Sequence, residues 1–263
     1  MINSVVHKVD GIDRPLLIRW STDDDLSQIY EWLKEEDELD VHGNFLCNWR
    51  LTEKCHKVGK LLVMLDETDG MPIAYQWGQL LQSGILQIRN GWRHKGLGRL
   101  LVQHCVELAL EQDEMVLQIE CEPSSSIPFW KAMGFTVVDG KYGDNPKGYR
   151  VLSKQLILPL NGVPKIVRVS VYPEERKWQD ILPIVSYSPE AVLGDDGKVY
   201  FAERAVFPDS LGRSMNDPVI EILLDGEVVY RDKAKYQEAK DHGVRWCRNG
   251  FYVDTLAMDL SIS

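Results

Sequence analysis

The residues best suited to chemistry form a basic turn with two glycines, which follows an apolar run and opens an amphipathic helix. The turn reads RHKGLGR over residues 93–99, in a chain whose formal net charge is -10. A helix N-terminus presents unpaired backbone N–H groups and a partial positive charge, and glycines let an anion approach that backbone closely. The pattern therefore predicts an anion-binding site. The alternative is an ordinary capped helix with a basic first turn.

The spacing of the glycines decides which anion the turn would hold. A P-loop needs G-x-x-x-x-G-K-[ST], which the chain lacks, and a dinucleotide fingerprint needs a third glycine where Leu101 stands. The turn instead fits R-x-x-G-x-G, with Arg93, Gly96 and Gly98 at the fixed positions. Both nucleotide-binding interpretations are therefore disfavoured.

A second motif lies further along, in IPFWKAMGF, where the aromatic pair Phe129 and Trp130 precedes Gly134 and Phe135. Together the two motifs and the order of expected elements resemble the GNAT superfamily of acyl-CoA-dependent N-acetyltransferases, over roughly the first three-fifths of the chain. The resemblance implies acetyl-CoA as cosubstrate, acetyl transfer to a primary amine by direct attack on the thioester, and a coenzyme cleft between two splayed strands.

The same resemblance assigns the coenzyme contacts. The main chain at Ile88, Arg89 and Asn90 would serve the pantetheine arm, and the turn would hold the pyrophosphate. The turn comprises Arg93, His94, Lys95, Gly96, Leu97, Gly98 and Arg99. Phe129, Ser124 and Ser125 are expected beside the coenzyme on its other side. Capping of the following helix is the alternative role for the two serines.

Three positions depart from the family pattern. Many relatives have a tyrosine that protonates the leaving thiolate where this chain has Trp130, whose indole N–H donates a hydrogen bond but is no useful acid. Gln118 stands where some relatives carry a glutamate base, and Pro123 where they carry an asparagine. Glu120, about 7 Å along the strand on the same face, is a candidate base acting through water. A solvated glutamate is the alternative, and an inactive coenzyme-binding sensor or interaction module is the alternative function.

The acceptor is expected to be a small-molecule or peptide amine, with a positive charge. Residues 23–40 hold nine acidic side chains against Lys34, and in the resembling family this region borders the acceptor mouth, so it would attract a cation. A solvated acidic helix face is the alternative. Trp32, Trp49 and Trp77 are either residues of the mouth or core aromatics. Acetylation of charged tRNA is disfavoured, because the net charge opposes nucleic-acid binding.

The expected fold is α+β, with a mixed, mostly antiparallel sheet flanked by helices over residues 1–158. Pro159, Asn161, Gly162 and Pro164 interrupt the periodicity. A smaller β-rich accessory domain is expected over 164–263, where alternating runs are separated by turn sequences such as DDGK and LLDGEVV. Closure of the acceptor cleft, a homodimer interface and partner binding are the roles open to it.

Composition sets the broad class of protein. The 263 residues are 44% hydrophobic and 27% charged, as in ordinary globular proteins. The five cysteines are odd in number and form no C-x-x-C pair, so reduced thiols are expected and a metal site is not. No run has the length of a signal-peptide core or a membrane span, which predicts a cytoplasmic protein.

Overall fold

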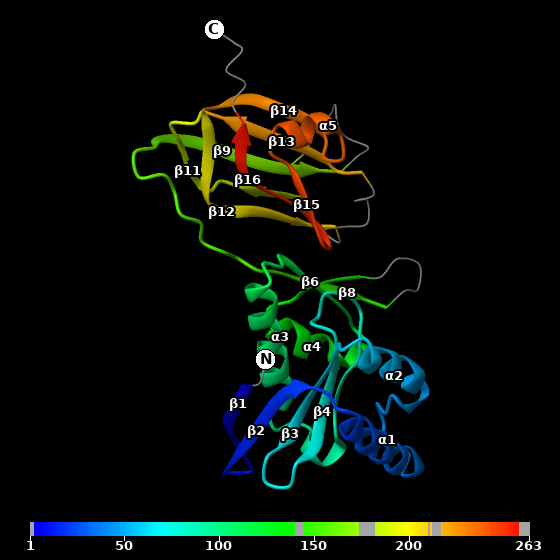
Figure 1. The fold of residues 1–263 in the computed structure, drawn as a ribbon. Helices are drawn as coiled ribbons and strands as arrows, with labels where there is room; N and C mark the ends of the chain where they lie inside the picture. Colours follow the sequence, from blue (N-terminus) through cyan, green and yellow to red (C-terminus); the bar gives the residue numbers. More distant parts are fainter. Residues whose placement is uncertain (1–2, 140–144, 174–181, 210, 212–216, 258–263) are drawn as a thin grey trace. The chain divides into compact units, whose positions relative to one another are not determined.

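The computed structural model describes residues 3–139, 145–173, 182–209, 211 and 217–257 (Figure 1). Contacts within the chain divide it into two compact units. The first comprises Met1–Gln112 with Leu117–Phe135, and the second comprises Asp113–Val116 with Thr136–Ser263. Each unit is described separately. The domain boundary near residues 158–164 stays a prediction.

The first unit is built on a five-stranded antiparallel sheet in the order β1-β2-β3-β4-β5. Its strands are β1 Asn3–Val9, β2 Ile12–Trp20, β3 Leu61–Asp66, β4 Met71–Trp77 and β5 Leu86–Ile88. Every residue of β3 is buried. Because neighbouring side chains of a strand point to opposite faces, this burial requires that both faces of the sheet are covered.

Helices supply that cover, with α1 and α2 on one side of the sheet and α3 on the other (Figure 1). The helices of this unit are α1 Asp23–Glu38, α2 Trp49–Lys57, α3 Leu97–Glu111 and α4 Ile127–Ala132, with 3-10 turns η1 Leu46–Asn48, η2 Asn90–Trp92 and η3 Ser124–Ser126. Ile29 and Leu33 of α1 pack in one buried cluster with Val63 and Tyr75. Apolar side chains at helical spacing therefore fix α1 on the sheet.

Two details at the start of the chain bear on the sequence expectations. Thr22, one of the two caps that the sequence predicts beside Asp23, caps α1, and Asp25 adds a capping box that the sequence prediction did not include. The apolar run PLLIRW predicts a strand over residues 15–20, within β2, whereas the sequence predicts no strand where β1 lies. Strand β1 pairs with β2 through the turn at Asp10 and Gly11, and most of its residues are half-buried or exposed. Its weak apolar alternation is that of an edge strand.

The expected coenzyme cleft lies where β5 ends this sheet. Within the five-stranded sheet β5 pairs with β4 on one side, while β6 Val116–Glu120 belongs to a different sheet. The N–H of Gln118 in β6 donates to the carbonyl of Leu80, in the segment between β4 and β5, at 2.7 Å. The two strands are thus neighbours without being paired, which leaves the outer edge of β5 available.

The second unit is rich in β-structure, as the sequence predicts. Its main sheet has the order β14-β13-β9-β11-β12-β16-β15, and β10 also pairs with β9. These strands are β9 Val163–Tyr172, β10 Val185–Tyr187, β11 Glu190–Leu193, β12 Lys198–Pro208, β13 Val219–Leu224, β14 Glu227–Lys233, β15 Arg245–Cys247 and β16 Gly250–Ala257. Strands β7 Thr136–Val138 and β8 Lys147–Val151 form an antiparallel pair, and one short helix, α5 Gln237–Asp241, follows β14.

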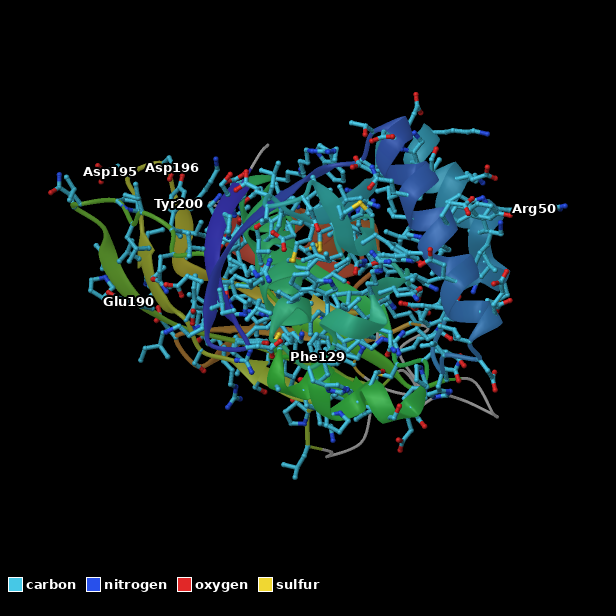
Figure 2. All side chains as sticks on the ribbon, turned by 90° about the horizontal axis from the view of Figure 1, so that it is seen from below. Arg50, Phe129, Glu190, Asp195, Asp196 and Tyr200 are labelled. Atoms are coloured by element: carbon cyan, nitrogen blue, oxygen red, sulfur yellow. The ribbon has the colours of Figure 1, made fainter. Side chains whose placement is uncertain are left out.

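Turns and an apolar core hold this unit together. Between β11 and β12 the hydroxyl of Tyr200 donates to the carboxylate of Asp196 at 2.8 Å, at the tip labelled in Figure 2. Phe201, Phe207 and Phe251 are among the largest fully buried side chains of the chain, and they share one cluster. Phe207 and Phe251 stack with ring centroids 5.2 Å apart. The expected hairpin turns are therefore confirmed by the strand pairing.

Candidate functional site

The glycine turn has the backbone shape that its sequence predicts. His94 and Gly96 adopt positive φ, 63° and 81°, and Gly96 is the N-cap residue of α3. No side chain caps this helix at Gly96. The first N–H groups of α3 are therefore available to an external acceptor, and the partial positive charge of the helix end lies at the same place.

The basic side chains of the turn have different surroundings. The guanidinium of Arg93 points into the protein, where it donates to the carbonyls of Ile88 at 3.1 Å, His42 at 2.7 Å and Gly43 at 3.4 Å. Lys95 pairs with Asp10 at 2.6 Å. His94 and Arg99 are exposed. A pyrophosphate at this turn would thus meet backbone N–H groups, His94 and Arg99, while Arg93 and Lys95 already bind protein groups.

The predicted pantetheine contacts at residues 88–90 are arranged around a buried carboxylate. Glu36 of α1 is 6% exposed, accepts a hydrogen bond from the N–H of Asn90 at 2.7 Å, and lies 3.7 Å from Arg93. The N–H of Arg89 donates to the carbonyl of Ile73 on β4. Alternate residues of an antiparallel strand bond to the neighbour, so the N–H groups of Leu86 and Ile88 face the outer edge of β5. Ile88 offers the coenzyme a backbone donor, whereas Arg89 and Asn90 bond within the protein.

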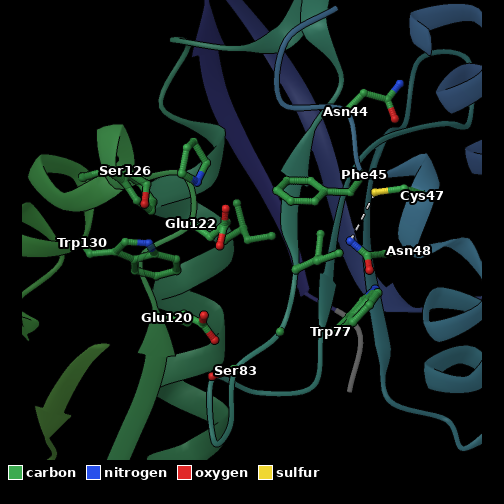
Figure 3. A pocket seen from close by; sticks show the side chains of 15 residues that line it. Asn44, Phe45, Cys47, Asn48, Trp77, Ser83, Glu120, Glu122, Ser126 and Trp130 are labelled. Carbon is green, nitrogen blue, oxygen red and sulfur yellow. Dashed lines mark hydrogen bonds between the residues drawn. The ribbon is translucent and has the colours of Figure 1, made fainter. Parts of the chain in front are cut away.

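A pocket of about 610 Å³ opens beside this edge (Figure 3). One wall comes from the segment around η1 and from the residues leading into β5, and the other from the end of β6 and from α4. The lining residues are Asn44, Phe45, Cys47, Asn48, Trp77, Ser83, Gly84, Ile85, Leu86, Glu120, Glu122, Pro123, Ser126, Phe129 and Trp130. The lining is largely apolar and aromatic, and its ionised groups are two carboxylates.

The aromatic pair of α4 connects the pocket with the glycine turn. Trp130 is 7% exposed, and its ring meets those of Phe129 and Phe135 edge-on at centroid distances of 5.0 and 5.3 Å. A Cβ on Gly98 would lie 3.3 Å from the ring of Phe129, which Figure 2 labels. A glycine at this position therefore lets α3 begin close against the pocket wall.

Two of the three candidate catalytic residues lie at the pocket. Glu120 and Trp130 both line the pocket, whereas Gln118 lies outside its lining. Cys121 is fully buried, and burial raises the pKa of its thiol. The alternation along β6 thus directs Glu120 to the pocket and Cys121 to the interior, as the sequence predicts.

The serines before α4 do not cap this helix with their side chains, although the sequence predicts a serine cap. Ser126 is the N-cap residue, yet its side chain makes no cap hydrogen bond. Ser124 and Ser125 lie in η3, are exposed, and are not among the pocket-lining residues. Pro128 near the helix start has no N–H and therefore needs no acceptor, which allows α4 to begin with one unpaired donor fewer and without a side-chain cap.

The acidic residues of α1 do not line this pocket, among the residues that the structure describes. Asp25 and Glu36 are buried in contacts with Arg19 and Asn90. Of the three tryptophans named as candidates, Trp77 lines the pocket, Trp49 packs on Tyr30, and Trp32 lines a separate pocket of about 230 Å³.

Several lining residues are absent from the sequence expectations. The largest group lies between α1 and α2 and carries no pattern that marks a site; it comprises Asn44, Phe45, Cys47 and Asn48. Glu122 could have been predicted from the sequence, because it follows Glu120 at the spacing that keeps two side chains on one face of an extended strand.

Among the described residues, no three His, Cys, Asp or Glu side chains gather around a metal-sized site. No described helix is long and apolar enough to span a membrane.

Comparison with known proteins places this site in a family. Residues 20–135 match the acetyltransferase (GNAT) family, and this part of the chain belongs to that family. The matched region contains the glycine turn, β6, α4 and every residue that lines the larger pocket. No curated protein matches the chain by sequence.

Solved structures with a similar fold include several acetyltransferases. A GNAT-family acetyltransferase from Listeria monocytogenes is 13% identical, with a TM-score of 0.44, and the match covers 57% of this chain and all of that one. The PaiA N-acetyltransferase from Thermoplasma acidophilum, crystallised with coenzyme A, is 16% identical, with a TM-score of 0.42, and the match covers 52% of this chain and 99% of that one.

Proposed function

We propose that this protein is an N-acetyltransferase, which transfers the acetyl group of acetyl-CoA to a primary amine by direct attack on the thioester. The observation that carries the proposal is the continuity of two features within the family-matched region. The pocket lies at the outer edge of β5, and Phe129 in its wall contacts the start of α3, where Gly98 leaves room. An anion site and an apolar pocket thus adjoin each other.

The residues at the turn fit the coenzyme. The helix start lacks a side-chain cap, Gly96 and Gly98 present no side chains, and exposed His94 and Arg99 flank them. These groups would hold the pyrophosphate, because backbone N–H groups at a helix N-terminus are suited to phosphate. The N–H groups of Leu86 and Ile88 would hold the amides of the pantetheine arm in the manner of an added strand.

The chain's own residues would act mainly by positioning. The coenzyme supplies a thioester carbonyl; the amine nitrogen forms the new C–N bond as the C–S bond breaks, the nitrogen loses one proton, and the sulfur gains one. Glu120 in the pocket wall would receive the amine proton through water, and Trp130 would donate a hydrogen bond without giving up a proton. Holding two reactants in line accounts for a large part of such a rate enhancement.

A second candidate function rests on Trp130. This residue takes the place of the tyrosine that the resemblance would lead one to expect, and it is 7% exposed among aromatic neighbours. A protein that binds the coenzyme without turning it over, as a sensor or interaction module, would tolerate that replacement.

Thiol release from acetyl-CoA, measured with a panel of primary amines, separates the two functions. The proposal expects amine-dependent release of coenzyme A together with an acetylated amine of the matching mass. Binding of acetyl-CoA with no turnover of any amine would contradict the enzyme and favour the second candidate. The absence of binding to folded protein would contradict both.

A further inference from the structure

We infer that the acceptor is a compact amine with one positive charge attached to an aromatic or apolar body, bound between Glu120 and Glu122 and the aromatic walls of the larger pocket. The inference rests on the proposed function and deepens it. The inferred acceptor differs from a polyamine or a peptide lysine, which are the acceptors that the acidic α1 helix alone would favour.

The first argument is the charge of the pocket. Of its 15 lining residues two are acidic, Glu120 and Glu122, and none is Lys, Arg or His. Glu120 is the last residue of β6 and Glu122 lies two residues further on, and both line the pocket. Figure 3 shows both carboxylates in the wall opposite Phe45 and Trp77. A site of this charge favours an ammonium group over an anion or a neutral alcohol.

The second argument is the nature of the walls. Phe45 and Trp77 lie on one side of the pocket and Trp130 on the other (Figure 3), and Phe129, Ile85 and Leu86 also line it. Aromatic faces attract a cation and also bury apolar surface well. An amine with an aromatic or branched apolar body satisfies both the carboxylates and the rings.

The third argument is what the pocket cannot offer a polycation. The two carboxylates can pair with at most two ammonium groups, so the third ammonium group of a triamine would be buried against aromatic walls without a partner, which is costly. The carboxylates of α1 do not supply partners, since Asp23 bonds His56 at 2.9 Å and Glu35 pairs with Arg89 at 3.4 Å. The volume of about 610 Å³ must also accommodate the thioester end of the coenzyme, so the acceptor body is small for a site of this size.

Isothermal titration tests the inference directly, with 2-phenylethylamine, spermidine and Nα-acetyllysine methylamide as probes, in the presence of coenzyme A. We expect 2-phenylethylamine to bind about tenfold more tightly than either of the others, which is the scale of one well-placed cation and ring interaction. Glu120→Gln and Glu122→Gln should each weaken it several-fold, because they remove charge and keep shape. Glu111→Gln, at the exposed end of α3, is the matched control and should change nothing.

Two results would overturn the inference. The first is spermidine or the lysine amide binding as tightly as 2-phenylethylamine, and the second is unchanged affinity in both glutamine variants of the pocket. Different outcomes contradict the inference about the acceptor and the proposed function. Tight binding of 2-phenylethylamine without acetyl transfer would contradict the enzyme alone, whereas efficient acetylation of spermidine in preference to 2-phenylethylamine would contradict the acceptor class alone.

Discussion

The buried carboxylate of Glu36 accepts a 2.7 Å hydrogen bond from the backbone N–H of Asn90, so the end of α1 is joined directly to η2, which immediately precedes the glycine turn. Arg93 continues the link, 3.7 Å from Glu36 and bonded to the carbonyl of His42. The segment that follows His42 supplies Asn44 and Phe45 to the pocket. One set of contacts therefore positions both the glycine turn and one wall of the larger pocket.

Removing the carboxylate should destabilise the first unit. Glu36→Ala leaves the N–H of Asn90 and the guanidinium of Arg93 without this partner, and a lost hydrogen bond to a buried charged group costs about 2 kcal/mol. We expect a decrease of that size in the free energy of unfolding, measured by urea denaturation. Glu35→Ala is the control, since the side chain of Glu35 is 66% exposed. Equal stability of the two variants would show that the Glu36 contact contributes nothing.

Arg93 should act as a positioning residue more than as a coenzyme ligand. Arg93→Lys keeps the charge but cannot donate to the carbonyls of Ile88, His42 and Gly43 together. We expect faster amide hydrogen exchange in residues 42–48 and a KM for the amine that rises more than the Kd for acetyl-CoA. Arg99→Ala, at an exposed position, should show the reverse: weaker coenzyme binding and unchanged exchange. A large loss of coenzyme affinity in Arg93→Lys, together with unchanged amide hydrogen exchange in residues 42–48, would contradict this role.

Trp130→Tyr should raise kcat, because a phenol can protonate the departing thiolate and an indole cannot. We expect an increase of at least about tenfold, which is less than the roughly 100-fold or more that general acid catalysis typically contributes, with the Kd for acetyl-CoA little changed. Trp130→Phe removes the N–H without adding an acid and should not raise kcat. If Trp130→Tyr folds, binds acetyl-CoA and turns over no faster, solvent already supplies this proton adequately.

Acid should weaken the second unit through Asp113. Hydrogen bonds from Arg204 and then Lys154 lower the pKa of Asp113 to about 2. Since the folded pKa lies below the usual 3.8, the stabilisation is present above about pH 4 and is lost as the pH falls towards 2. The side chain is 45% exposed, so solvent screening reduces the effect to about 1 kcal/mol.

Urea unfolding of Asp113→Asn at pH 7 and pH 2.5 measures this contribution. The variant should be less stable than wild type at pH 7, and the difference should shrink markedly at pH 2.5. Asp195→Asn, at an exposed turn position, is the control with no such pH dependence. A difference between Asp113→Asn and wild type that is constant with pH would exclude ionisation as its cause.

Local patterns in the sequence predicted much of the fold. The helix cap at Thr22, the apolar face of α1 and the DG and NG turns of the second unit each depend on residues close in the chain, and the structure has all of them. Strand β1 was missed because NSVVHKV is a short edge strand whose residues are mostly half-buried or exposed. Its pairing with β2 depends on the neighbouring strand more than on its own pattern.

The site was harder to predict, because its contacts join distant parts of the chain. The motif marked Arg93 as a basic residue of the turn, yet its acceptors are carbonyls of His42 and Gly43, and backbone carbonyls carry no sequence signal. The acidic content of α1 suggested an acceptor wall, whereas Glu36 bonds inward to Asn90. Alternation along β6 directed Glu120 to the pocket and, extended by one step, would have added Glu122.

Titration calorimetry of acetyl-CoA tests the central claim most directly, in wild type, Gly96→Asn and Gly96→Asp. Gly96 has φ of 81°, a conformation that Asn and Asp tolerate better than other side chains, so the two variants share their strain and their contact with His7 and differ in charge. The account predicts binding to wild type, retained binding to Gly96→Asn and at least about tenfold weaker binding to Gly96→Asp, since a carboxylate there would repel the pyrophosphate. Equal affinity of the two variants, or no binding to folded wild-type protein, would contradict a coenzyme site at this turn.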